Sequence, residues 1–148
     1  LDLDLKIEEI EIGKSKIIRK GKKIAYLVFG TILKNIHNIA DKYNATVVDM
    51  RFVKPLDEKM IIDICQTLEY IFTVEENVIL GGAGSAVNEI ILKNKLKNEV
   101  CNIGIPDKTI PHGNQDEILS EIGLDEKGID ETTNNHIRNM VELNKKIT

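Results

Sequence analysis

Tryptophan is absent from this 148-residue sequence, cysteine occurs twice, and only 4% of the residues are aromatic. The two cysteines, Cys65 and Cys101, lie far apart with no Cys-x-x-Cys spacing and no paired histidines. This excludes a disulfide framework or a zinc site and predicts buried, reduced thiols. The longest unbroken apolar run, residues 24–29, is far shorter than the roughly 20 residues that a membrane-spanning helix needs. We therefore expect no membrane partner.

The start of the chain carries neither an initiator methionine nor a basic and apolar secretory leader. Its length suits one domain, and its 42% hydrophobic and 30% charged content is ordinary for a globular protein. We expect one soluble domain cut from a longer chain. In this interpretation residues 1–12 are a linker from a preceding domain and residues 13–148 are the domain itself.

The sequence also lacks a large excess of charge of either sign, since 20 basic and 24 acidic residues give a formal charge of -4. A weakly acidic chain argues against nucleic-acid binding, which normally needs a basic patch. The local exception is a basic stretch without interleaved aromatic residues, formed by Lys14, Lys16, Arg19, Lys20, Lys22 and Lys23. We interpret it as a solvated edge strand or hairpin, where lysines discourage aberrant strand pairing.

Strand-like and helix-like segments alternate along the chain, which predicts an α/β fold with a mostly parallel sheet between helical layers. The predicted strands are 16–19, 24–29, 46–50, 70–74 and 100–105. The predicted helices are 31–43, 58–66 behind an Asp57 N-cap, a segment after Ser85, 115–122 and about 129–145. We expect strand 16–19 to pair antiparallel with strand 24–29 through a turn at Gly21.

A glycine cluster separates the strand at 70–74 from the next helix. Gly81, Gly82, Gly84 and Ser85 could present free backbone N–H groups to an anion. However, their spacing matches neither the dinucleotide fingerprint nor a Walker A loop, and the preceding glutamates would repel phosphate. A tight turn with close helix–sheet packing is therefore the favoured interpretation, and an anion site is the alternative.

Charged residues precede this cluster at the same expected edge of the sheet. Glu75 and Glu76 are adjacent on a strand and point to opposite faces, so they are poorly placed as an acid–base pair. Helix capping or contact with another domain is favoured, and a place in a ligand crevice is the alternative. Arg51 could bind a carboxylate or phosphate, but we expect it to pair with Glu75 or Glu76. His112, in a Pro-His-Gly loop, is the best-placed histidine, although an ordinary loop role is favoured. No reaction follows from these residues.

Several of these segments resemble the 1-deoxy-D-xylulose-5-phosphate synthase family. They are Asp-Met-Arg-Phe-Val-Lys-Pro-Leu-Asp at 49–57, Thr-Val-Glu-Glu-Asn at 73–77, Gly-Gly-Ala-Gly-Ser-Ala-Val at 81–87, Ile-Gly-Ile-Pro-Asp at 103–107, Pro-His-Gly at 111–113, Gly-Leu-Asp at 123–125 and Gly-Ile at 128–129. The Glu-Glu and Gly-Gly-x-Gly theme is shared with transketolases and with the beta subunits of 2-oxo-acid dehydrogenases. The segments at 51–57 and 104–107 favour the synthase, while Lys108 and Thr109 depart from the aromatic residues common there.

The resemblance implies the third, C-terminal domain of such a synthase. It implies a three-layer α/β/α sandwich with a five-stranded sheet, one strand antiparallel, like the transketolase C-terminal domain. The family enzyme is a homodimeric transferase that depends on thiamine diphosphate and Mg²⁺. It condenses pyruvate with D-glyceraldehyde 3-phosphate to give 1-deoxy-D-xylulose 5-phosphate and carbon dioxide, for isoprenoid, thiamine and pyridoxal synthesis.

The family's metal-binding Gly-Asp-Gly motif and its activating glutamate are absent from this sequence. We therefore expect no catalytic residue, bound cofactor or metal in this chain, and no activity from it alone. Its expected partners are the other domains of the same enzyme and a second copy, with Arg51, Glu75, Glu76 and the loop at 81–85 in the domain contact. The expected location is the bacterial cytoplasm, with a plastid-type compartment left open. Two alternatives stay open: a free-standing anion-binding module using the loop at 81–85, and the C-terminal domain of another transketolase-type enzyme.

Overall fold

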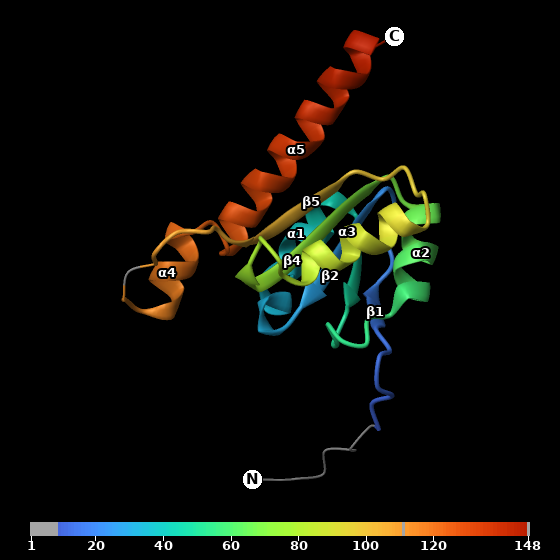
Figure 1. Ribbon diagram of the computed structural model, residues 1–148. Coiled ribbons are helices and arrows are strands. Elements are labelled where there is room, and N and C mark those ends of the chain that lie inside the picture. The colour runs from blue at the N-terminus through green and yellow to red at the C-terminus, as the bar shows by residue number, and fades with distance from the viewer. Residues whose placement is uncertain (1–8, 111, 148) are drawn as a thin grey trace.

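Five strands form one mixed sheet in a computed structural model that describes residues 9–110 and 112–147 (Figure 1). The strands are β1 (Lys16–Arg19), β2 (Ile24–Phe29), β3 (Thr46–Asp49), β4 (Tyr70–Val78) and β5 (Val100–Ile105). Their order across the sheet is β1-β3-β2-β4-β5, with β1 antiparallel to β3 and all other pairs parallel. The expected α/β fold with one antiparallel strand is confirmed.

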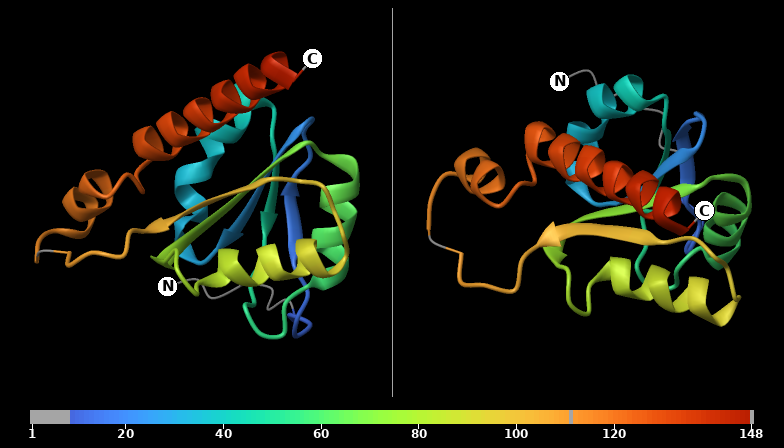
Figure 2. Two further views of the ribbon diagram at one scale, coloured as in Figure 1. Left: turned by 45° about the horizontal axis from the view of Figure 1, so that its top comes forward. Right: turned by 90° about the horizontal axis from the view of Figure 1, so that it is seen from above.

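Helices cover both faces of this sheet and make three layers (Figure 2). On one face lie the 3-10 helix η1 (Thr31–Ile36), α1 (His37–Tyr43) and α5 (Glu126–Ile147). On the other lie α2 (Glu58–Thr67) and α3 (Ala83–Lys93). The strand β2 is buried along its whole length, because both layers pack against it. No helix in the described part of the chain is long and apolar enough to cross a membrane.

The expected pairing of β1 with β2 is wrong, because β1 pairs with β3 instead. After β1 ends at Arg19, the chain crosses the start of β3 at Gly21, whose N–H donates to Thr46 Oγ1 at 2.9 Å. The next N–H, that of Lys22, donates to the carbonyl of Asn44 at 2.7 Å. A Cβ on Gly21 would lie 2.1 Å from that carbonyl oxygen, so only glycine allows this close crossing. As a result, β2 enters the sheet on the far side of β3.

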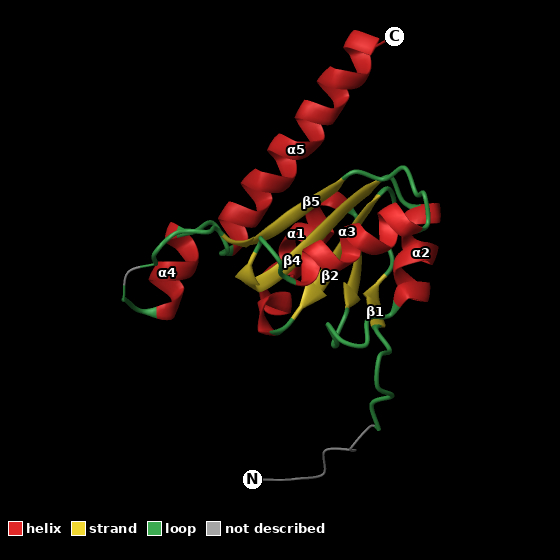
Figure 3. Ribbon diagram, viewed as in Figure 1, coloured by secondary structure: helices red, strands yellow, loops and turns green. Residues whose placement is uncertain are grey.

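The bounds of β4 and of the last helix differ from those predicted from the sequence. The strand β4 continues to Val78, four residues beyond its predicted end, with a register shift against β5 between Val74 and Val78. This extension carries Glu75 and Glu76 beyond the body of the sheet. The last helix begins at Glu126, and the short helix α4 (Gln115–Glu121) stands away from the sheet on a long connection (Figure 3).

Asp57 caps α2, as predicted, and also ties the start of the chain to it. Its carboxylate accepts hydrogen bonds from the Met60 N–H at 3.2 Å and from both the N–H and the hydroxyl of Ser15 at 2.9 Å. Burial alone would raise the pKa of Asp57, but these hydrogen bonds outweigh it, so the pKa lies below its ordinary value. The ionised carboxylate therefore stabilises the fold.

Candidate functional site

A cavity of about 410 Å³ opens at the carboxyl ends of β2 and β4. This is where the strand order reverses, the position at which open α/β sheets form crevices. Five of the eight residues singled out in the sequence line it: Arg51, Glu75, Glu76, Gly81 and Gly82. The remaining three lie elsewhere, Gly84 and Ser85 in the first turn of α3 and His112 between β5 and α4.

Glu75 turns inward and caps α3. Its carboxylate accepts hydrogen bonds from the N–H of Ala83 at 2.7 Å and of Gly84 at 2.8 Å, and the residue is only 2% exposed. A Cβ on Gly82 would lie 2.5 Å from one carboxylate oxygen, so the glycine makes room for the contact. The positive end of the α3 dipole therefore already binds an anion, and that anion belongs to the protein.

The other members of the glycine loop serve its turn and its packing. Gly81 adopts φ +76°, and its N–H donates to Ser85 Oγ at 3.1 Å. The Ser85 hydroxyl in turn donates to the carbonyl of Ile79 at 3.1 Å. A Cβ on Gly84 would meet Thr73 Oγ1 at 2.5 Å, which shows how closely α3 approaches the sheet. The loop thus has the tight-turn and close-packing role favoured from the sequence.

Glu76 points away from Glu75, as predicted, and accepts a hydrogen bond from the Thr31 hydroxyl. The expected pairing of Arg51 with either glutamate is wrong. Arg51 has a left-handed backbone, with φ +59°, and its N–H donates to Asp49 Oδ1 at 3.2 Å. Its Nε lies 3.6 Å from Asp49 Oδ2. The backbone turns the guanidinium back over Asp49, while the Glu75 carboxylate is already bonded to α3.

His112 is exposed and does not line this cavity. Its neighbour Pro111 lies outside the described residues. The structure therefore brings the charged strand ends and the glycine loop together, and it leaves the Pro-His-Gly loop apart from them.

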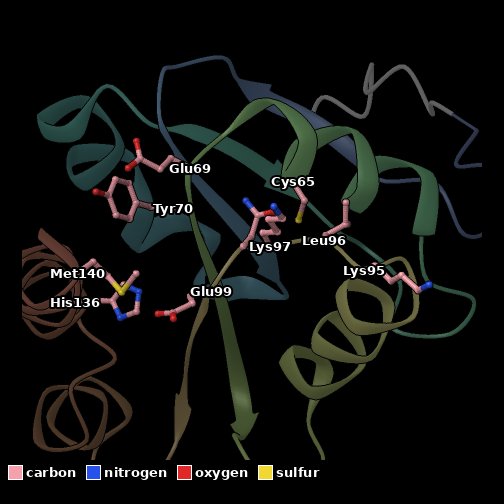
Figure 4. Close-up of a pocket in the computed structure, with 10 residues that line it drawn as sticks. Cys65, Glu69, Tyr70, Lys95, Leu96, Lys97, Glu99, His136 and Met140 are labelled. Atoms are coloured by element: carbon pink, nitrogen blue, oxygen red, sulfur yellow. The ribbon is translucent and has the colours of Figure 1, made fainter. Parts of the chain in front are cut away.

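A larger cavity, of about 590 Å³, lies at the opposite, amino ends of β4 and β5. Lysine and glutamate side chains both line it, and the Glu99 carboxylate points toward the His136 ring in Figure 4. Among the described residues, no hydrogen-bond partner reaches His136 Nε2. No residue singled out as a candidate site residue contributes to this cavity, because its walls come from distant segments without a shared motif.

The two cysteines are free thiols that differ in burial. Cys65 is buried and also lines the 590 Å³ cavity, and burial raises its pKa to about 11. Cys101 is partly buried, and burial raises its pKa as well. Nowhere in the described part of the chain do three His, Cys, Asp or Glu side chains group so that they could hold a metal ion.

The fold belongs to a known class of domain. Residues 13–129 match the family model described as "Transketolase, C-terminal domain", and the chain belongs to this family. A solved structure described as "Split gene transketolase, inactive beta4 tetramer" shares the fold, with a TM-score of 0.76 and 22% identity. The match covers 86% of this chain and 43% of that one.

Within this class, the chain is similar to the C-terminal domain of 1-deoxy-D-xylulose-5-phosphate synthases. The synthase of Vibrio campbellii is 46% identical over 136 residues, which are 92% of this chain and 22% of the synthase. That of Blochmanniella pennsylvanica is 52% identical over 124 residues, 84% and 20% of the two chains. That of Haemophilus influenzae is 50% identical over 131 residues, 88% and 21% of the two chains. The chain thus spans about a fifth of the length of these relatives.

Proposed function

We propose that this chain is the C-terminal domain of a 1-deoxy-D-xylulose-5-phosphate synthase of the bacterial cytoplasm. In that enzyme it packs against the other domains and contributes to a homodimer. The whole enzyme condenses pyruvate with D-glyceraldehyde 3-phosphate, and the catalytic residues lie outside this chain. The observation that carries the proposal is 46–52% identity to synthases over 84–92% of this chain.

The strand-end cavity is the proposed contact with a preceding domain. Three exposed apolar side chains lie in the segments around it, Val53, Val78 and Leu80, with 51%, 39% and 69% of their surfaces accessible. Arg51 and Glu76 add polar groups to the same surface. Apolar side chains beside a few charged groups are typical of interfaces. The family match begins at residue 13, which supports a linker over residues 1–12.

The residues described here do not fit the cofactors of the whole enzyme, thiamine diphosphate and Mg²⁺. A diphosphate would bind best at a helix N-terminus in this edge of the sheet, but Glu75 occupies that position on α3. Glu76 adds a further negative charge beside it. We therefore assign both cofactors to the other domains. The same geometry counts against the alternative of a free-standing anion-binding module.

A chimeric synthase tests the proposal. Residues 13–148 of this chain replace the matched region of the Haemophilus influenzae synthase, and the dimer content and turnover of pyruvate with D-glyceraldehyde 3-phosphate are measured. We expect a dimer with turnover within about tenfold of the parent synthase, and loss of both properties when the region is deleted. A folded chimera that stays monomeric and inactive would contradict the proposal.

Paired variants of the chimera test the contact surface. Val53→Asp combined with Leu80→Asp places charges in the proposed interface, so we expect a loss of domain association and a fall in turnover of at least tenfold. Leu92→Asp is the matched control, because Leu92 is 80% exposed on α3 away from the cavity. An equal effect of the control, or no effect of the pair, would place the domain contact on another surface.

A further inference from the structure

A third cavity, of about 600 Å³, lies at the amino ends of the strands, at the opposite end of β2 and β4 from the proposed domain contact. Its apolar walls include the rings of Tyr43 and Tyr70 and, from α5, the side chains of Ile137 and Val141. Its volume falls within the ~300–1,000 Å³ range of small-molecule sites. The basic stretch noted in the sequence supplies two of its lining residues, Lys22 and Lys23.

Lysines line the rim of this cavity, while Asp130 interacts with the Tyr43 hydroxyl and Glu69 with the Tyr70 hydroxyl. Among its described lining residues are two lysines and no carboxylate. Both lysines are exposed, and neither makes an ion pair within the described part of the chain. This distinguishes the cavity from the 590 Å³ cavity, where lysines and glutamates face the same space. An anionic group bound on the Lys22 and Lys23 side of the 600 Å³ cavity would therefore contact two cations and no lining carboxylate.

The loop that carries these lysines is held firmly in place. The Lys22 N–H donates to the carbonyl of Asn44 at 2.7 Å. The Lys23 carbonyl accepts hydrogen bonds from the N–H groups of Glu69 and Tyr70, both at 2.8 Å. These bonds fix Lys23 in a left-handed backbone conformation, with φ +63°. The backbone of the two lysines is therefore held in a defined position at the mouth of the cavity.

The opposite wall is also fixed. The helix α5 is tied to the sheet by a buried hydrogen bond between Thr133 Oγ1 and the Tyr26 hydroxyl, 2.8 Å long. Ile137 follows one turn later and packs against the core, whereas Val141, one further turn on, is 40% exposed. The cavity is thus preformed between the anchored part of α5 and the pinned lysine loop, which lowers the cost of ordering it around a ligand.

We infer that this cavity binds a small amphiphilic anion. The apolar body of the ligand packs between Tyr43, Tyr70 and Ile137, and its phosphate or carboxylate head pairs with Lys22 and Lys23. Both parts contribute, because burial of the body removes apolar surface from water while the head pairs with two cations. The inference does not rest on the proposed function and concerns the opposite end of the sheet.

The test is a titration of the 148-residue chain with octyl phosphate, followed by amide chemical shifts and kept below the concentration at which the probe forms micelles. We expect saturable shifts confined to residues 22–24, 43–44, 70 and 134–141. Octanol and inorganic phosphate, which each carry one half of the ligand chemistry, should bind at least tenfold more weakly. No saturation with octyl phosphate, or equal binding of either half, would overturn the inference.

Matched lysine variants separate the site from general surface charge. Lys22→Gln combined with Lys23→Asn should weaken octyl phosphate binding at least tenfold, since asparagine tolerates the positive φ at position 23. The control is Lys59→Gln combined with Lys95→Asn, because Lys59 and Lys95 are exposed and Lys95 also has a positive φ, of 54°. Equal weakening by both pairs would contradict the site. If the chain bound phosphatidylserine vesicles but showed no saturable binding of octyl phosphate, the small-molecule site would be refuted in favour of a membrane-surface role.

Discussion

Replacement of Glu75 by alanine removes the side chain that holds the N-terminus of α3 against β4. The carboxylate accepts two hydrogen bonds, of 2.7 and 2.8 Å, from the N–H groups of Ala83 and Gly84. A hydrogen bond to a charged group contributes about 1.5–3 kcal/mol, and a buried donor left unpaired costs a similar amount. Since water can enter the vacated space at the helix end, we take the lower part of the summed range, about 3–4 kcal/mol.

The assay is urea unfolding of the chain at pH 7, followed by circular dichroism. Glu75→Ala should lower the free energy of unfolding by about 3–4 kcal/mol, and Glu75→Gln by about 2 kcal/mol because one acceptor oxygen remains. Glu76→Gln is the matched control. Its carboxylate is only partly buried and accepts a single hydrogen bond from Thr31, so about 1 kcal/mol is expected. A Glu75→Ala effect below 1 kcal/mol, or one no larger than that of the control, would refute the capping argument.

Three further predictions concern the glycine loop, Asp57 and Cys65. Gly82→Ala should cost about 2–3 kcal/mol because its Cβ would lie 2.3 Å from the Val78 carbonyl oxygen. Gly81→Ala, whose Cβ meets nothing within 4 Å, should cost about 1 kcal/mol from its positive φ alone, and the same urea assay ranks the two. The Asp57 pKa is lowered on folding, so its stabilisation is complete above the ordinary pKa of 3.8 and is lost as the pH falls through the folded-state value. The stability gap between wild type and Asp57→Asn should therefore stay constant from pH 7 to about pH 4 and shrink as the pH falls further, and a gap that stays constant below pH 4 would contradict this linkage. Cys65, buried and with a pKa of about 11, should react with iodoacetamide at pH 8 at least tenfold more slowly in the folded chain than in urea, and equal rates would contradict its burial.

The bounds of β2 were predictable because a strand buried on both faces leaves a continuous apolar run. The bounds of β5, a partly buried edge strand, were also predicted, because Pro106 marks its end. The Asp57 cap predicted the start of α2. The pairing of β1 could not be predicted in the same way. It depends on how closely Gly21 crosses the backbone at Asn44, and this long-range contact leaves no mark in local periodicity.

The same division holds for the candidate site. The location of the site was inferred from residue order, because the carboxyl ends of parallel strands meet at one edge of the sheet. Helix capping was also among the roles inferred for Glu75. The partner of Arg51 could not be inferred, since it depends on a left-handed backbone that arginine rarely adopts. The cavity beside Lys23 was missed because Tyr43, Tyr70 and Ile137 reach it from three separate segments.

Our central proposal is that this chain is a structural domain of a larger enzyme, and that the catalytic residues and the cofactor sites of that enzyme lie in its other domains. The most direct test is calorimetric titration of the purified chain, and of the chimeric synthase, with thiamine diphosphate in the presence of Mg²⁺, together with turnover of pyruvate and D-glyceraldehyde 3-phosphate. The account predicts saturable binding and turnover for the chimera and neither for the chain alone. Saturable binding or turnover by the chain alone would contradict it.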